Sequence, residues 1–147
     1  MPQTRERVFI VGTRPDVATF VHPEPVCSSY ITAREAIGDL EHLDEDEEFN
    51  HIWSLANKSP EQGNRKMVAE RAGCTIRAEC HGNMQFHYSL PRRISMREAA
   101  RFQSFPDSFI FDAKLRETER QVGNAVPPVL AWHIAKAVEN VLTGGEA

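Results

Sequence analysis

The chain has 147 residues, of which 41% are hydrophobic and 26% charged, the composition of a globular protein of about one domain. Its apolar runs, such as Val8 to Val11, are far shorter than the roughly 20 residues that cross a bilayer, and no export signal is recognisable. Three cysteines without a pairing pattern argue against a disulfide framework. Secreted and membrane classes are therefore excluded, and we expect an intracellular, cytoplasmic protein.

The net charge of −4 is unevenly distributed along the chain. The segment from Glu35 to Glu48 contains eight acidic residues and no Lys or Arg, whereas Lys58 to Arg101 contains nine bases and four acids. A basic surface beside an acidic one can steer a polyanion to one face of a protein. The same distribution is also typical of two solvated faces of a soluble protein.

The first third of the chain predicts a strand and a short helix. Residues 7–13 contain the continuous apolar run Val8–Val11 ended by Gly12, which favours a strand covered on both faces. Thr32-Ala33-Arg34-Glu35 is a capping box, and the apolar residues that follow predict a short helix up to Leu40.

The middle of the chain is less regular. Ser59-Pro60 can begin another short helix, with Ser59 as its cap. Residues 75–78 and 86–88 predict two short strands across a turn at His81-Gly82-Asn83.

The last third predicts two helices. Ser95-Met96-Arg97-Glu98 is a second capping box, and the helix that it begins is stopped by Phe105-Pro106. Pro127-Pro128 opens a final helix that ends before Gly144-Gly145. Its apolar face needs a partner surface.

Four segments, in this order, resemble the C-terminal part of a DNA (cytosine-5) methyltransferase. Residues 2–12, PQTRERVFIVG, match a Q-x-R-x-R segment that runs into a strand, and residues 32–40, TAREAIGDL, match the short helix after it. Residues 93–107, RISMREAARFQSFPD, and residues 120–128, RQVGNAVPP, match the two long blocks near the end of that family's sequences.

The resemblance implies roles for the first segment. Enzymes of this family swing the target cytosine out of the duplex and read its exposed edge. Arg5 is expected to hold a backbone phosphate, Arg7 to donate to O2 of the cytosine, and Gln3 to shape the surface that faces DNA. Taken without the other segments, three polar residues before a strand would indicate only an exposed strand entry.

The fourth segment implies the cofactor side. The family holds part of S-adenosylmethionine with this Asn and its neighbours, so Gly123, Asn124, Ala125 and Val126 are the expected cofactor-binding residues. Gly123-Asn124 is expected just before a helix start, where backbone N–H groups point outward. The alternative is an ordinary turn into a helix begun by proline.

The resemblance also divides the chain. Residues 1–40 would be the end of the catalytic domain, 41–91 the target-recognition region, and 92–147 the C-terminal blocks. The expected fold is α+β, a fragment of a doubly wound methyltransferase sheet with a small irregular recognition lobe. Double-stranded DNA would be read by basic and amide side chains of the middle region, namely Lys58, Arg65, Lys66, Arg77, Asn83 and Gln85. Arg93, Arg97 and Arg101 can contact phosphate or form structural ion pairs.

A zinc site is a competing interpretation of Cys74, Cys80, His81 and His87. The C-x2-C spacing typical of structural zinc is absent, so we expect no metal, with buried cysteines and solvent-facing or phosphate-facing histidines instead.

Several catalytic elements of the family are missing from the sequence. No cysteine lies in a Pro-Cys-Gln element, and neither a Glu-Asn-Val element nor a Gly-rich cofactor-binding turn is present. The chain is therefore expected to be inactive alone and to complete an active site with a polypeptide that carries the N-terminal motifs, in a bacterial or phage-type, restriction–modification setting. Two alternatives stay open: a non-catalytic DNA-binding remnant, and a scaffold that self-associates, as a homodimer, through exposed apolar surface.

Overall fold

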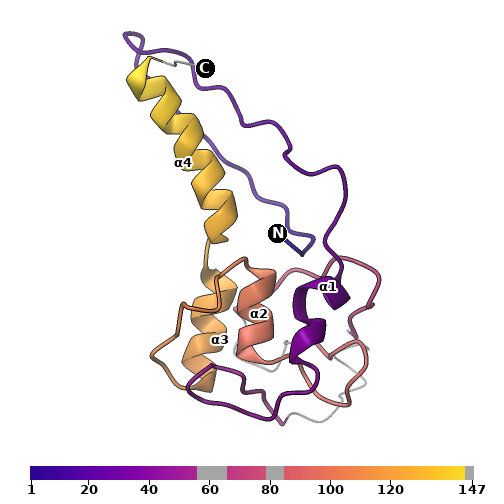
Figure 1. Ribbon diagram of the computed structural model, residues 1–147. Helices are drawn as coiled ribbons and strands as arrows, with labels where there is room; N and C mark the ends of the chain where they lie inside the picture. Colours follow the sequence, from indigo (N-terminus) through magenta and orange to yellow (C-terminus); the bar gives the residue numbers. More distant parts are fainter. Residues whose placement is uncertain (56–65, 79–84, 145–147) are drawn as a thin grey trace.

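Three short helices lie side by side in one half of the molecule (Figure 1). The computed structural model describes residues 1–55, 66–78 and 85–144. Helix α1 spans Ala33–Ile37 and continues into the 3-10 turn η1 at Gly38–Leu40, α2 spans Met96–Phe102, and α3 spans Leu115–Asn124. Helix α2 packs against both α1 and α3. We call this half, together with residues 1–5 and the loops between the helices, the body.

Both predicted capping boxes are confirmed. Thr32 Oγ1 accepts a hydrogen bond from the Glu35 N–H at 3.2 Å, and Glu35 Oε2 accepts one from the Thr32 N–H at 2.7 Å. Ser95 and Glu98 form the same reciprocal pair, at 3.0 and 2.7 Å. The first N–H groups of a helix have no partner within it, so these side chains determine where α1 and α2 begin.

The hydrophobic core lies in the body and is centred on α2. Met96, Ala99, Ala100 and Phe102 are each at most 1% exposed. The core draws on the first, middle and last thirds of the chain. Its other members are Ala33, Ile37, Met67, Ile76, Tyr88, Ile94, Phe111 and Val122.

Helix α3 has no counterpart among the predicted elements. Its sequence, LRETERQVGN, offers only Leu115 and Val122 as large apolar residues, too few to make an apolar stripe visible in the sequence. Thr118 and Val122 are nevertheless fully buried, because α3 packs against α2. Packing against the folded body therefore stabilises α3 more than the helix-forming tendency of its own sequence does.

The other half of the molecule is an arm, which we define as α4, Pro128–Thr143, with the extended residues 8–31 that run along it (Figure 1). The predicted final helix is confirmed, with Pro128 in its first turn and Gly144 ending it at a left-handed φ of 78°. Residues 8–31 follow α4 to its far end, turn, and return to α1. No residue of α4 is buried, so the arm has no core of its own.

The predicted strands are wrong. Residues 7–13 pair with no other segment, and Val8 and Ile10 are 87% and 94% exposed. Residues 75–78 form no strand and Phe86 makes only isolated bridges, to Lys66 and Arg93. A strand needs a neighbour about 4.8 Å away to take its hydrogen bonds, and none lies beside residues 7–13 in the described chain. The described residues are mainly helix and loop, so the strand part of the expected α+β fold is not seen in them. The predicted helix at Ser59 lies outside the described residues.

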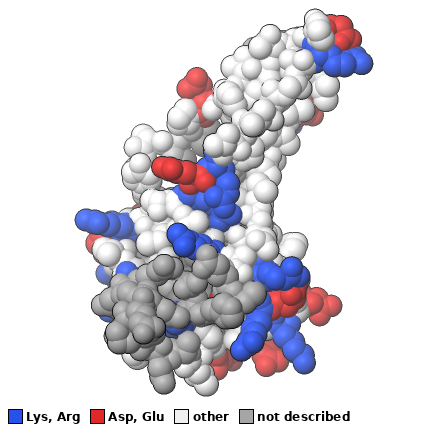
Figure 2. Space-filling model, turned by 180° about the vertical axis from the view of Figure 1, so that it is seen from behind, with Lys and Arg blue, Asp and Glu red and all other residues white. Residues whose placement is uncertain are grey.

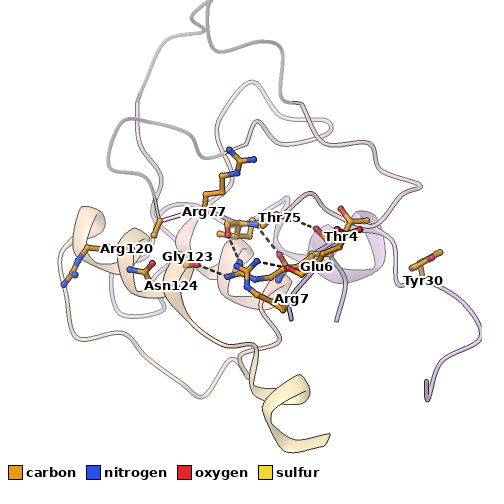
Figure 3. Close-up of a pocket in the computed structure, with 13 residues that line it drawn as sticks. Thr4, Glu6, Arg7, Tyr30, Thr75, Arg77, Arg120, Gly123 and Asn124 are labelled. Atoms are coloured by element: carbon orange, nitrogen blue, oxygen red, sulfur yellow. Dashed lines mark hydrogen bonds between the residues drawn. The ribbon is translucent and has the colours of Figure 1, made fainter. Parts of the chain in front are cut away.

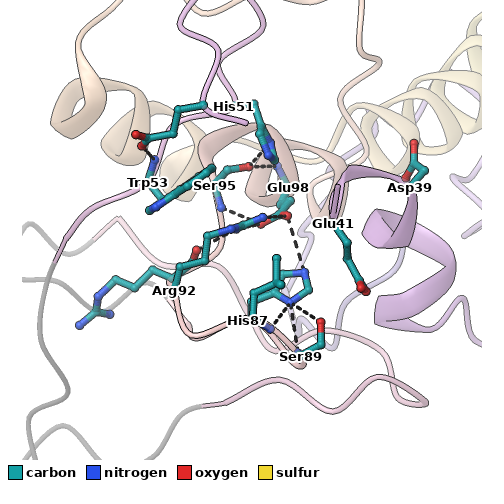
Figure 4. Close-up of polar contacts among 12 residues, drawn as sticks. Asp39, Glu41, His51, Trp53, His87, Ser89, Arg92, Ser95 and Glu98 are labelled. Carbon is teal, nitrogen blue, oxygen red and sulfur yellow. Dashed lines mark hydrogen bonds and ion pairs between the residues drawn. The ribbon is translucent and has the colours of Figure 1, made fainter. Parts of the chain in front are cut away.

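A network of buried charged side chains fixes the loops around α2 (Figure 4). Glu98 is fully buried, and both its carboxylate oxygens accept from Arg92 at 2.8 Å. Arg97, also fully buried, donates to the carbonyl oxygens of Phe49 and Phe109, both at 2.9 Å. A charge without partners is costly to bury, so these contacts are what make a charged α2 compatible with the core.

Candidate functional site

A cleft of about 1110 Å³ opens on the side of the body where the arm joins it (Figure 3). Its walls come from three parts of the chain that are far apart in sequence: residues 3–7, residues 75–78, and the end of α3. Tyr30 also lines it. The cleft therefore brings the first and fourth methyltransferase-like segments together.

One wall forms because residues 2–5 lie against residues 73–76. The Thr4 N–H donates to the Gly73 carbonyl at 2.8 Å, and the Gly73 N–H donates to the Pro2 carbonyl at 2.9 Å. Thr75 Oγ1 donates to the Thr4 carbonyl at 2.5 Å. A Cβ atom on Gly73 would lie 2.7 Å from the Phe102 ring, so only glycine allows this close approach to α2.

The two predicted catalytic arginines differ in their contacts. Arg5 is half-buried and donates from Nη1 to the Ile76 carbonyl at 2.8 Å and from Nη2 to the Gly123 carbonyl at 3.4 Å. Burial lowers the pKa of the Arg5 guanidinium, with a smaller contribution from the nearby charge of Arg7, but a guanidinium stays protonated in proteins. Arg7 is exposed, and its Nη1 donates to the Glu6 carbonyl at 2.8 Å. Arg5 joins the walls, and Arg7 presents its charge to the opening.

Gln3, predicted to face DNA, is 6% exposed. Its amide donates to Gln103 Oε1 at 2.6 Å and accepts from the Ile76 N–H at 3.2 Å. Its side chain therefore lies at the back of the cleft, where it is hydrogen-bonded to residues of the body.

The other wall is the end of α3. Gly123-Asn124 was expected before a helix start, but both residues lie in the last turn of α3, where the groups without helical partners are carbonyls rather than N–H groups. Gly123 is buried, and a Cβ atom there would lie 2.4 Å from the Ala78 nitrogen. Asn124 is exposed at the cleft, where its amide can both donate and accept. Ala125 is half-buried and Val126 is 57% exposed, and neither lines the cleft.

Of the predicted DNA-reading residues, Arg77 lines the cleft and is exposed. Lys66 is exposed on the body but does not line it. Gln85 is 6% exposed, with its backbone carbonyl accepting from the Ile94 N–H. Three further predictions, Lys58, Arg65 and Asn83, lie outside the described residues.

The cleft is strongly basic. Four arginines line it, against Glu6 as the one acidic residue of its described lining. Sequence reasoning missed Arg120, whose guanidinium pairs with Glu117 at 2.6 Å, although it opens the fourth segment and so could have been selected with it. The four are Arg5, Arg7, Arg77 and Arg120.

The three arginines of the third segment serve the body. Arg101 forms ion pairs with Asp39 at 2.5 Å and with Asp107 at 2.6 Å, and hydrogen bonds from Arg101 lower the pKa values of both carboxyl groups. Arg93 is 2% exposed and its guanidinium lies 4.8 Å from the centre of the Phe86 ring. The predicted structural ion pairs are thus confirmed for Arg101 and, with Asp107 at 3.9 Å, for Arg97.

The expected burial of the cysteines in this group is wrong for Cys74, which is exposed. His87 is fully buried rather than solvent-facing, and its Nδ1 accepts from the N–H groups of Ser89 and Leu90, both at 3.2 Å. Cys80 and His81 lie outside the described residues. Within the described ranges, no three His, Cys, Asp or Glu residues are grouped as a metal site would require, and no helix there is long and apolar enough to cross a membrane.

Comparison with known proteins gives the same family as the motifs. Residues 57–140, more than half of the chain, match the model of the C-5 cytosine-specific DNA methylases. The chain is 33% identical to the type II methyltransferase M.NgoFVII of Neisseria gonorrhoeae, over 94% of this chain and 46% of the relative. It is 35% identical to the type II methyltransferase M.MthTI of Methanothermobacter thermautotrophicus, over 98% of this chain and 54% of the relative.

The chain thus spans about half the length of the curated relatives that it matches. Enzymes of the matched family use S-adenosylmethionine as their methyl donor. On the extent of these matches, the chain belongs to the C-5 cytosine-specific DNA methylase family.

Proposed function

We propose that this chain is the C-terminal portion of a DNA (cytosine-5) methyltransferase. It supplies DNA recognition and part of the pockets for cytosine and S-adenosylmethionine, and it is completed by a polypeptide that carries the N-terminal motifs. The observation that carries the proposal is the cleft, which joins residues 3–7 to Gly123-Asn124 across more than a hundred residues of sequence.

Arg7 is the residue proposed to contact the extruded base. Its exposed guanidinium at the cleft can donate to O2 of a cytosine. When a thiolate adds to C6 of the ring, electron density moves toward O2 and N3, and a fixed positive donor at O2 stabilises it. The thiolate is the contribution of the other polypeptide.

Arg5 is proposed to hold a DNA phosphate while it joins the two walls. Each of its Nη nitrogens donates to a carbonyl and carries a second hydrogen. Arg77 and Arg120 add positive charge to the same opening. A cleft lined by one sign of charge concentrates the opposite charge, here the backbone of double-stranded DNA.

Asn124 is proposed as the contact to S-adenosylmethionine, which supplies the methyl group. The exposed amide of Asn124 fits a polar contact to such a ligand. Gly123 serves this contact indirectly, because its lack of a side chain lets residues 77–78 pack against the end of α3. The remaining contacts to the cofactor would come from the partner.

The arm is the proposed docking surface for that partner. Figure 2 shows the arm as a largely uncharged surface above a body on which charged side chains gather. Val8 and Ile10 on the extended segment and Trp132 and Leu142 on α4 are each more than half exposed. Apolar surface of this kind marks an interaction site, and the curated relatives are about twice as long as this chain. Residues 8–11 would add as a strand to the partner's sheet.

The test is reconstitution of methyl transfer. The chain is mixed with the N-terminal portion of M.NgoFVII, or of another relative that carries the missing elements, and transfer of labelled methyl groups to duplex DNA is measured. We expect transfer with the mixture and none with either part alone. Arg7→Ala should reduce the rate by at least about a hundredfold, whereas Arg116→Ala, an exposed arginine outside the cleft, should leave it unchanged.

Failure of every such mixture to transfer methyl groups would overturn the proposal. Salt-sensitive DNA binding by the chain without methyl transfer would then indicate the DNA-binding remnant. A discrete homodimer without DNA affinity would indicate the self-associating scaffold.

A further inference from the structure

Behind the cleft, two glutamine side chains form a continuous chain of hydrogen bonds between its walls. The Ile76 N–H donates to Gln3 Oε1 at 3.2 Å, Gln3 Nε2 donates to Gln103 Oε1 at 2.6 Å, and Gln103 Nε2 donates to the Val122 carbonyl at 2.7 Å. We call these four residues the amide relay. Gln3 is 6% exposed and Gln103 is fully buried, so water does not compete for these bonds.

The direction of the relay is set by its two ends. A backbone N–H can only donate, and a backbone carbonyl can only accept. Each glutamine must therefore accept on the Ile76 side and donate on the Val122 side, which fixes the orientation of both amides. Of the other side chains of this length, a carboxylate has no hydrogen to donate and an apolar group has neither function.

The relay runs parallel to the contacts that form the cleft. Arg5 spans the same two segments from the open side, through the carbonyls of Ile76 and Gly123. Gly123 follows Val122 directly, and the residue after it is Asn124. The walls that carry Arg5 and Asn124 are thus joined twice, once at the surface by a guanidinium and once in the interior by Gln103 and Gln3.

We propose that Gln103 is a positioning residue, which holds the wall bearing Arg5 and Arg7 in register with the wall bearing Asn124. It is fully buried and lies behind the lining of the cleft, where neither base nor cofactor would reach it. The inference rests on the proposed function for its catalytic consequence, but the relay itself exists in the chain alone. Because both walls share one fixed set of bonds, displacement of one wall moves the other.

The most informative variant is Gln103→Glu. A protonated carboxyl group accepts on one oxygen and donates from the other, so it can replace the amide, whereas a carboxylate would face the Val122 carbonyl with no hydrogen between them. Burial raises the pKa of a carboxyl group, to as much as about 8–9 in documented cases. The variant should therefore work at low pH and fail at high pH. Gln103→Leu, of similar size, should fail at both.

The first readout uses the full chain without a partner. Backbone amide resonances of Ile76 and Gly123 should shift together in Gln103→Glu at about pH 8.5 and return to the wild-type positions at about pH 5.5. Gln121→Glu, an exposed glutamine on α3, should cause no such pH-dependent pair of shifts. The side-chain amide hydrogens of Gln3 and Gln103 in the wild-type chain should exchange slowly, which tests the relay even if a variant does not fold.

The second readout is kcat/KM in the reconstituted enzyme. Gln103→Glu should lose about tenfold or more at high pH, the effect of one unmade buried hydrogen bond, and should approach the wild-type value at low pH. Equal loss in Gln103→Glu and Gln103→Leu at every pH, or fast exchange of both amides in the wild type, would overturn the inference. If reconstitution fails while the resonances behave as expected, the proposed function is wrong and the relay stands.

Discussion

Helices α2 and α4 show opposite relations between sequence and burial. Three of the seven residues of α2 are charged, yet six of the seven are buried. Ten of the sixteen residues of α4 are apolar, yet none is buried. The difference lies in what surrounds each helix: α2 has α1, α3 and the loops around it. In the described chain, the first turn of α4 bonds to Ser104 of the body, and the extended residues 8–31 run along the rest of the helix. The body buries its apolar residues in a core, whereas the arm has the apolar composition of a core but leaves these residues at the surface.

The largest effect should come from removing a core side chain of the body. Phe102→Ala empties the space between α2 and Gly73, where the ring is fully buried, and should lower the free energy of unfolding by about 3–5 kcal/mol. The matched change in the arm is Leu142→Ala, at a side chain that is 73% exposed, with an effect within about 0.5 kcal/mol. Denaturant unfolding measures both. Similar losses in the two variants would mean that the arm shares the core.

The buried ion pair of α2 should come next. Glu98→Ala leaves the Arg92 guanidinium, whose side chain is only 11% exposed, without its carboxylate, and it removes the acceptor of the Ser95 N–H. Removing one partner of a buried pair costs about 3–5 kcal/mol, and we expect the lower end because Arg92 can turn toward water. Glu117→Ala, which breaks the exposed pair with Arg120 on α3, should cost at most about 1 kcal/mol. A loss at Glu98 no larger than that at Glu117 would contradict the importance of burial.

The body should also lose stability as the pH falls below neutrality. His51 and His87 flank Glu98, and both rings are fully buried. Burial is the main cause that lowers the pKa of each imidazole below the ordinary 6.5, although the charge of Glu98 opposes it. His87 has a further reason to stay neutral, since its Nδ1 accepts two backbone N–H groups.

The sign follows from the unfolded state. Unfolded chains take up these protons near pH 6.5, whereas the folded body does so only at lower pH, so the free energy of unfolding falls as the pH is lowered through that range. Burial raises the pKa of Glu119 above its ordinary 4.5. Above that pH, this carboxyl group makes the free energy of unfolding rise as the pH is lowered, opposite to the effect of the histidines. Unfolding measured between about pH 7.5 and 5.5 in a Glu119→Gln background isolates the histidines. His87→Asn should flatten the dependence, and an unchanged slope would exclude His87 as its source.

These contrasts explain how far the sequence could predict the structure. Signals that are satisfied within a few residues were reliable: the capping boxes at Thr32 and Ser95, and the proline and glycine that bound α4, are all confirmed. Residues 7–13 carried an equally clear strand pattern, but a strand takes its hydrogen bonds from another segment. The residues at a helix end are enough to predict where the helix begins or ends. Whether a segment forms a strand depends on a second segment that lies beside it in the fold.

The candidate site divides in the same way. Motif resemblance selected Arg5, Arg7 and Asn124, and the structure brings them to one cleft. It could not predict that Gln3 would turn inward to Gln103, because that hydrogen bond joins positions a hundred residues apart. Helix α3 was missed because its burial depends on α2 rather than on an apolar stripe of its own.

The most localised effect should come from the end of the arm. Gly144 has a φ of 78° with no atom within 4 Å of a Cβ placed there, so a substitution would meet backbone strain and no clash. Gly144→Ala should therefore weaken the last turn of α4 by about 1–2 kcal/mol, whereas Gly144→Asn, which tolerates the left-handed conformation, should cost less. If the arm is not part of the core, the alanine variant loses helical circular dichroism and its amide hydrogens exchange faster only within α4, while the unfolding midpoint of the body stays the same. A lower midpoint in Gly144→Ala would show instead that α4 unfolds together with the body, and that its exposed apolar face contributes to the stability of the chain even without a partner.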